Sequence, residues 1–157
     1  MTTGLSGNQK RKMKSAARLY AVQALFQMEA SDTDAETVRD EFLAHRFGAQ
    51  EDDVEWIDGN VNLFESLLTG AVRNQAKIDQ HTDQALVAKW PIDRIDPTLR
   101  ALFRAAGAEF VANKTPPKVV ITEFVDVAKA FFPDGREAKF VNAVLDHMAR
   151  EICPDKF

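Results

Sequence analysis

The basic residues near the N-terminus are the first side chains of this chain whose chemistry suggests a use. Residues 1–28 contain five of them and no acidic residue. They are Lys10, Arg11, Lys12, Lys14 and Arg18. Positive side chains gathered without acids neutralise phosphates, so this pattern is typical of a segment that binds a polyanion. A solvated tail that keeps the protein soluble is the alternative.

The remainder of the chain is acidic, since the whole chain has a net charge of −4 at pH 7. The acids concentrate between Glu29 and Glu55, where Arg39 and Arg46 are the only basic residues. Such a body would repel a polyanion, so the sequence predicts that a polyanion binds at the N-terminal end. The acidic region 29–55 has no role that the sequence assigns.

Side chains that could catalyse a reaction or hold a metal ion form no recognisable pattern. His45, His81 and His147 each lack a second ligand at helical spacing, and the seven glycines form no phosphate-binding loop. Cys153 is the single cysteine, so it cannot form an internal disulfide. We therefore expect a protein that is not an enzyme and that uses no cofactor and no metal.

The elements that must position the candidate residues are predicted to be helices. Apolar residues recur with a helical period in seven segments, and no strand alternation is found. The expected helices are about 15–30, a second one opened by a Thr33/Glu36 capping box, 57–78, 82–89, 97–110, 117–131 and one ending near Met148. No apolar run approaches the roughly 20 residues of a membrane span. The sequence thus predicts an all-α bundle of about seven helices, without membrane contact and in the cytoplasm.

Three blocks of sequence resemble one known family. The tail is the most distinctive, because packing alone does not require a Lys-Phe-Val-Asn opening to a helix. The blocks are Arg18–Phe26, then Trp90–Ile95 leading to Leu102–Arg104 and Glu109–Phe110, then Lys118–Phe124 with Lys139–Asp146. In this order, and from about residue 14 to 150, they resemble the NusB family of bacterial transcription antitermination factors.

The resemblance implies a fold and a function. The fold is two packed three-helix sub-bundles with one further helix, formed by a single domain over 14–153. A flexible basic arm over 1–13 would precede it, and a short tail over 154–157 would follow. Proteins of this family pair with NusE, a small-subunit ribosomal protein, and bind the boxA element of nascent RNA. The complex joins RNA polymerase and other Nus factors and helps the polymerase to read through terminators, notably in ribosomal RNA operons. A homodimer is a further state that the sequence leaves open.

The resemblance also implies which residues bind RNA at the N-terminus. Lys14 and Arg18 match the first and last basic positions of the family's arginine-rich motif. Ser15, Ala16 and Ala17 stand between them where relatives often carry arginines. This departure predicts weaker binding, for which Lys10, Arg11 and Lys12 could compensate, because phosphate contacts tolerate displacement along the chain.

A second part of the implied RNA surface lies around the turn at 133–135. Arg136 and Lys139 are the charged candidates there, and Phe140 could stack on a base. Phe140 also begins the apolar stripe of the last helix, so the choice between core and RNA contact stays open. The same holds for Phe131 and Phe132, of which helical periodicity favours Phe131 inside. Glu123 and Asn142 are expected to link the last two helices by buried hydrogen bonds.

For the protein partner, the resemblance points to the aromatic position at the end of the first helix. That residue is Phe26, where relatives commonly have tyrosine, so it is the predicted NusE contact. Two other classes remain open. One is a helical adaptor that binds proteins but no RNA. The other is an accessory domain related to the N-terminal part of a ribosomal RNA cytosine methyltransferase.

Overall fold

Seven α-helices account for most of the residues that the structure describes. The structure is a computed structural model, and it describes residues 6–45, 50–51, 54–55, 60–86 and 95–157. The helices are α1 (Gly7–Ser31), α2 (Ala35–His45), α3 (Val61–Arg73), α4 (Gln75–Ala85), α5 (Pro97–Ala112), α6 (Pro117–Phe131) and α7 (Arg136–Ile152), and the 3₁₀ helix η2 (Pro154–Lys156) follows them. The predicted all-α fold class is confirmed.

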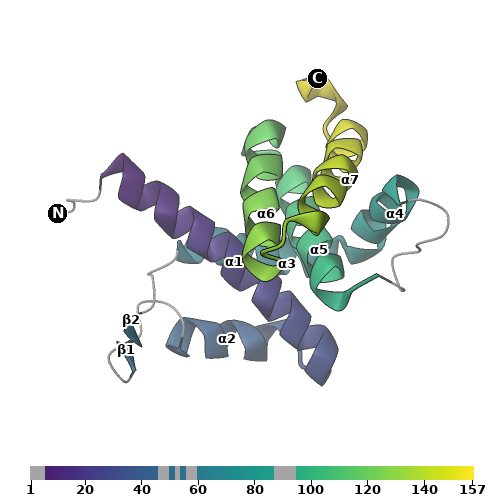
Figure 1. The fold of residues 1–157 in the computed structure, drawn as a ribbon. Coiled ribbons are helices and arrows are strands. Elements are labelled where there is room, and N and C mark those ends of the chain that lie inside the picture. The colour runs from purple at the N-terminus through teal and green to yellow at the C-terminus, as the bar shows by residue number, and fades with distance from the viewer. Residues whose placement is uncertain (1–5, 46–49, 52–53, 56–59, 87–94) are drawn as a thin grey trace.

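The helices form two packed groups (Figure 1). Helices α1, α2 and α3 pack against one another, and so do α5, α6 and α7. Helix α4 is the additional one, and it contacts α5 and α7. Helix α5 joins the two groups because it also packs against α1 and α3. This is the arrangement of two three-helix sub-bundles and one further helix that the resemblance implied.

Helix α5 is the centre of the core. Between Ala101 and Phe110 every residue is buried except Arg104, which is half-buried. Gly107 lies where α5 approaches α4, and a Cβ atom added there would overlap the Cγ2 atom of Ile78 and lie 3.1 Å from its Cγ1 atom. The missing side chain therefore allows the close approach of the two helices.

A Gly107→Ala substitution is expected to lower the free energy of unfolding by about 1–3 kcal/mol, because the added methyl group overpacks a filled core. Urea denaturation followed by circular dichroism measures the change. Gly7→Ala is the control, since its Cβ atom would meet only the Arg11 side chain at 3.7 Å. If Gly107→Ala is as stable as the control, the α4–α5 contact is looser than the structure shows.

Helix α1 begins earlier than the sequence predicted. Its first turn is closed by a capping box, in which the Ser6 hydroxyl accepts a hydrogen bond from the Gln9 N–H (3.1 Å) and the Gln9 side chain accepts one from the Ser6 N–H (2.7 Å). The helix thus starts at Gly7 rather than near Ser15. The basic residues expected on a flexible arm over 1–13 are therefore on a helix from Gly7 onward.

Two other helix boundaries differ from the prediction. The Thr37 N–H donates to the Asp34 carboxylate at 2.8 Å, so Asp34 rather than Thr33 caps α2. The predicted helix 57–78 is divided at Asn74, whose backbone N–H and side-chain amide both donate to the Gly70 carbonyl oxygen. The next predicted helix, 82–89, is not a separate element. Its first residues belong to α4, which ends at Ala85.

The described residues also contain one short hairpin that the sequence did not predict. Strands β1 (Gln50–Glu51) and β2 (Val54–Glu55) pair antiparallel. No described helix is both long enough and apolar enough to span a membrane. Ile57, Lys89 and the block Trp90–Arg94 lie outside the described residues.

Candidate nucleic-acid interface

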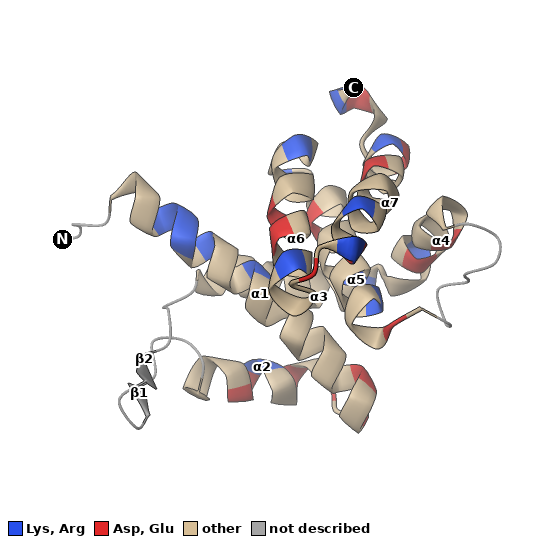
Figure 2. Ribbon diagram, in the orientation of Figure 1, with Lys and Arg blue, Asp and Glu red and all other residues tan. Residues whose placement is uncertain are grey.

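The first half of α1 projects from the bundle and carries a run of basic residues (Figure 2). Lys10, Arg11, Lys12 and Lys14 are all exposed on this segment. The helix is held to the body at Met13, whose carbonyl oxygen accepts a hydrogen bond from the Asn60 N–H at 3.0 Å. We call the four exposed basic residues the α1 basic segment. Because they are at positions 10, 11, 12 and 14 of one helix, their charges point around its axis rather than along one side.

Arg18 does not belong to this exposed set. Its side chain is 4% exposed, and its guanidinium binds Glu109 through Nε and Nη2 at 2.9 and 2.8 Å. Its Nη1 atom donates to the Glu123 carboxylate at 2.9 Å. Burial opposes the charge of Arg18, but the hydrogen bonds and attraction of Glu109 and Glu123 outweigh burial, so its pKa is raised. Arg18, which was predicted to contact RNA, is therefore not part of the exposed basic surface, because its guanidinium already has its partners inside the protein.

The neighbouring positions that depart from the family motif are also largely internal. Ala16 and Ala17 are buried, whereas Ser15 is exposed and donates to the Glu123 carboxylate at 2.7 Å. Glu123 therefore joins α6 to α1 rather than to α7 as predicted, and Asn142 is exposed. Of the three departures, Ser15 is thus the one at which an arginine would extend the exposed positive surface directly.

A second group of basic residues lies where α6 ends and α7 begins. Arg136 is 86% exposed, and its Nε atom is 3.8 Å from the Asp134 carboxylate. Lys139 and Lys129 are exposed as well. Gly135 turns the chain into α7 with a φ of +80°, a conformation that favours glycine. Lys129 was not among the predicted RNA-binding residues, and it lies in the last turn of α6, where a positive side chain also interacts favourably with the helix dipole.

The aromatic residues of this region pack at the edge of the hydrophobic core. The Phe140 ring packs against Phe103 in a T-shaped contact, with 6.2 Å between ring centroids, and the residue is half-buried. Phe131 and Phe132 are both half-buried against the core, so the predicted division into one inside and one outside is wrong. Part of the Phe140 side chain is exposed, but its contact with Phe103 shows that it packs against the core.

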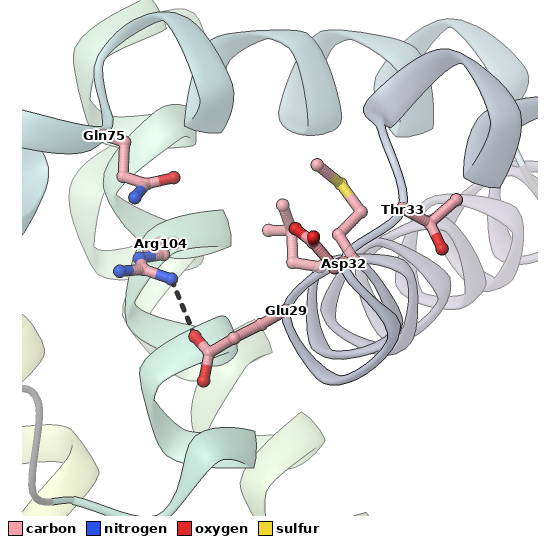
Figure 3. Close-up of a pocket in the computed structure, with 7 residues that line it drawn as sticks. Glu29, Asp32, Thr33, Gln75 and Arg104 are labelled. Atoms are coloured by element: carbon pink, nitrogen blue, oxygen red, sulfur yellow. Dashed lines mark hydrogen bonds and ion pairs between the residues drawn. The ribbon is translucent and has the colours of Figure 1, made fainter.

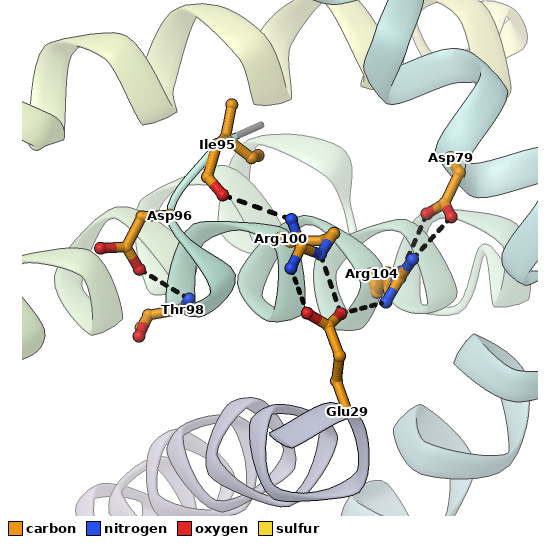
Figure 4. A network of polar contacts seen from close by, with 7 residues as sticks. All are labelled: Glu29, Asp79, Ile95, Asp96, Thr98, Arg100 and Arg104. Atoms are coloured by element: carbon orange, nitrogen blue, oxygen red, sulfur yellow. Dashed lines mark hydrogen bonds and ion pairs between the residues drawn. The ribbon is translucent and has the colours of Figure 1, made fainter. Parts of the chain in front are cut away.

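Phe26 is on the other half of α1, far along the helix from the basic segment. It is 39% exposed, which makes it one of the few large apolar side chains at the surface of the described residues. Three residues further on, Glu29 accepts hydrogen bonds from Arg100 and Arg104 (Figure 4). These contacts fix the surface beside Phe26, so an aromatic group is presented on a rigid support.

The two arginines that bind Glu29 belong to a network that joins three helices. Arg104 binds both oxygens of Asp79 at 3.0 and 2.8 Å and the Glu29 carboxylate at 3.0 Å. Arg100 binds Glu29 and also donates to the Ile95 carbonyl oxygen at 3.3 Å. The hydrogen bond from Arg100 is the largest cause of a lowered pKa at Glu29, so this carboxylate stays ionised. Within the described residues, no three His, Cys, Asp or Glu side chains are grouped so that they could hold a metal ion.

Comparison with known proteins identifies the family. The model of the NusB family matches residues 15–150. A transcription antitermination protein NusB from Maricaulis maris is 45% identical over 147 residues, which are 93% of this chain and 91% of the relative. NusB of T. maritima, a solved structure, is 27% identical with a TM-score of 0.70 and covers 100% of this chain and 99% of its own. A structure of NusB and NusE in complex with dsRNA has the same fold, with a TM-score of 0.67 and 24% identity over 87% of this chain and 96% of its own. The chain belongs to the NusB family.

Proposed function

We propose that this protein binds boxA RNA together with NusE and so helps RNA polymerase to pass terminators in ribosomal RNA operons. The observation that carries the proposal is the α1 basic segment, four exposed positive residues on a chain that is otherwise acidic. As a member of a family of transcription antitermination proteins, the chain is a NusB antitermination factor and not an enzyme. NusB proteins of this fold include one solved with NusE and dsRNA.

In this proposal the RNA surface consists of two parts. The α1 basic segment supplies phosphate contacts, which give affinity and a strong dependence on salt. Arg136 and Lys139, with Lys129, extend the positive surface along the end of α6 and the start of α7, and the exposed part of Phe140 is adjacent to them in sequence. Arg18 acts on this surface indirectly, because its contacts with Glu109 and Glu123 fix α1 against α5 and α6.

The partner surface in this proposal is centred on Phe26. It is on the same helix as the basic segment but nearer to the other end, so RNA and NusE would contact α1 at separate places. A single rigid helix would then hold both ligands in a fixed relation. This arrangement predicts that NusE and RNA bind at the same time rather than in competition.

Titration of a fluorescent boxA RNA with the protein, with and without purified NusE, tests the proposal. We expect NusE to increase the affinity for boxA and to leave the affinity for a scrambled RNA of the same length low. Equal binding of the two RNAs would mean that the basic segment binds polyanions without preference for the boxA sequence. No RNA binding even with NusE would favour the alternative of a helical adaptor that binds proteins alone.

A further inference from the structure

A cavity of about 330 Å³ opens where the end of α1 faces the first turn of α4 and the side of α5 (Figure 3). Its apolar wall is formed by Leu25 and Met28. The polar residues around it are Glu29, Asp32, Thr33, Gln75 and Arg104. Pockets for drug-sized ligands span about 300–1,000 Å³, so this cavity is at the small end of that range and suits a single long side chain.

The charges around the cavity favour a positive occupant. Arg104 is the one basic residue among those that line it, and its guanidinium is already bound by Asp79 and Glu29. Asp32 is exposed and makes no ion pair with any described residue. An unpaired carboxylate therefore stands opposite an arginine whose charge is compensated, and the cavity presents a net negative field.

The Asp32 backbone and the Glu29 carboxylate, which both line the cavity, are held by contacts within the protein. Asp32 has a φ of +52°, and its N–H donates to the Met28 carbonyl oxygen, which ends α1. Glu29 is held by Arg100 and Arg104, as described above. A side chain that enters such a rigid site loses its own freedom but does not have to order the site.

We propose that this cavity receives a lysine or arginine side chain of the protein partner that docks on Phe26. The methylene groups of such a side chain would lie along Leu25 and Met28, and its charged end would reach Asp32. Phe26 and Glu29 are three residues apart on one helix and are therefore neighbours on its surface, so the cavity continues the aromatic contact. This inference rests on the proposed pairing with NusE and gives part of the acidic region 29–55 a role.

Changing the charge at Gln75 tests the inference, because this exposed residue lines the cavity and is at the start of α4. We expect Gln75→Glu to bind NusE about 2–5-fold more tightly and Gln75→Lys about 2–5-fold more weakly in 50 mM salt, as for partly exposed charge pairs. The difference should shrink in 500 mM salt because of screening. Asp32→Asn, which tolerates a positive φ, should weaken binding by a similar factor.

Gln84→Glu and Gln84→Lys are the matched controls, since Gln84 is exposed on the same helix but does not line the cavity. Calorimetric titration with NusE measures all six proteins. Equal affinities across the Gln75 pair, or tighter binding by Gln75→Lys, would overturn the inference while wild-type binding still supports the proposed function. A wild-type protein that does not bind NusE would instead contradict the proposed pairing itself, and this inference with it.

Discussion

Replacing Arg18 with alanine is expected to lower the free energy of unfolding by about 3–5 kcal/mol, because removing one member of a buried ion pair leaves the other charge uncompensated. The group left behind is Glu109, which is 3% exposed on the central helix α5. Glu123 is affected less, since it is partly exposed and keeps the hydrogen bond from Ser15. Urea denaturation followed by circular dichroism measures the effect.

A double substitution separates the cost of the unpaired charge from the loss of packing. Arg18→Met with Glu109→Met replaces the ion pair by apolar side chains, which is often neutral for stability. We therefore expect the double variant to recover most of the loss seen for Arg18→Ala and to bind boxA RNA within a few-fold of wild type. A stability loss below about 1 kcal/mol for Arg18→Ala would mean that the Arg18 guanidinium is not buried in an ion pair. Arg18 would then again be a candidate for contact with RNA.

Phe26→Asp is expected to weaken the complex with NusE at least about 30-fold, which corresponds to about 2 kcal/mol, because aromatic residues at the centre of an interface carry much of its binding energy. The fold should survive, since Phe26 is 39% exposed and is not part of the buried core. The helical signal in circular dichroism and the affinity for NusE are measured on the same preparation.

Phe157→Asp is the matched control for this substitution. Phe157 is 47% exposed at the far end of the chain, where its ring contacts the Arg150 guanidinium. We expect this variant to bind NusE as tightly as wild type does. If both variants bind NusE normally, the partner surface is elsewhere; if Phe26→Asp unfolds the protein, Phe26 is a core residue.

The helix ends that the sequence predicted best are those marked by a proline or a glycine. Asp96 caps α5, with its carboxylate accepting from the Thr98 N–H at 2.7 Å, and Pro97 is the first residue of that helix (Figure 4). Pro117 begins α6, and Gly135 precedes α7. These signals are local in sequence, so a single chain suffices to detect them.

The start of α1 and the division at Asn74 were missed for a related reason. The segment before Ser15 has no apolar period, because its helix projects from the bundle and buries little. Its real start depends on the Ser6–Gln9 capping box, which apolar patterning cannot detect. At Asn74 the apolar period continues across the break from α3 to α4, so the pattern merged two helices into one.

The role of Arg18 could not be predicted from its own surroundings in the sequence. Its partners are 91 and 105 residues away, and a contact over that separation depends on how the helices pack. Glu109 was the usable signal, because a carboxylate among the alanines and Phe110 of a buried helix requires a partner. Basic residues in a motif are therefore candidates for internal pairing as well as for RNA.

The most direct test of the account is the salt dependence of boxA binding in a variant with the α1 basic segment neutralised. The variant changes Lys10, Arg11, Lys12 and Lys14 to Gln, which preserves helix propensity. The control removes the same charge at exposed positions elsewhere, by changing Lys77, Lys114, Lys118 and Lys156 to Gln.

Four phosphate contacts on a single strand give a slope of about −2.8 in a plot of log affinity against log salt, or about 50-fold weaker binding between 50 and 200 mM salt. We predict that the neutralised variant loses about this much slope relative to wild type, while the control keeps the wild-type slope. A neutralised variant whose slope and affinity equal those of wild type would contradict the assignment of the RNA surface to α1.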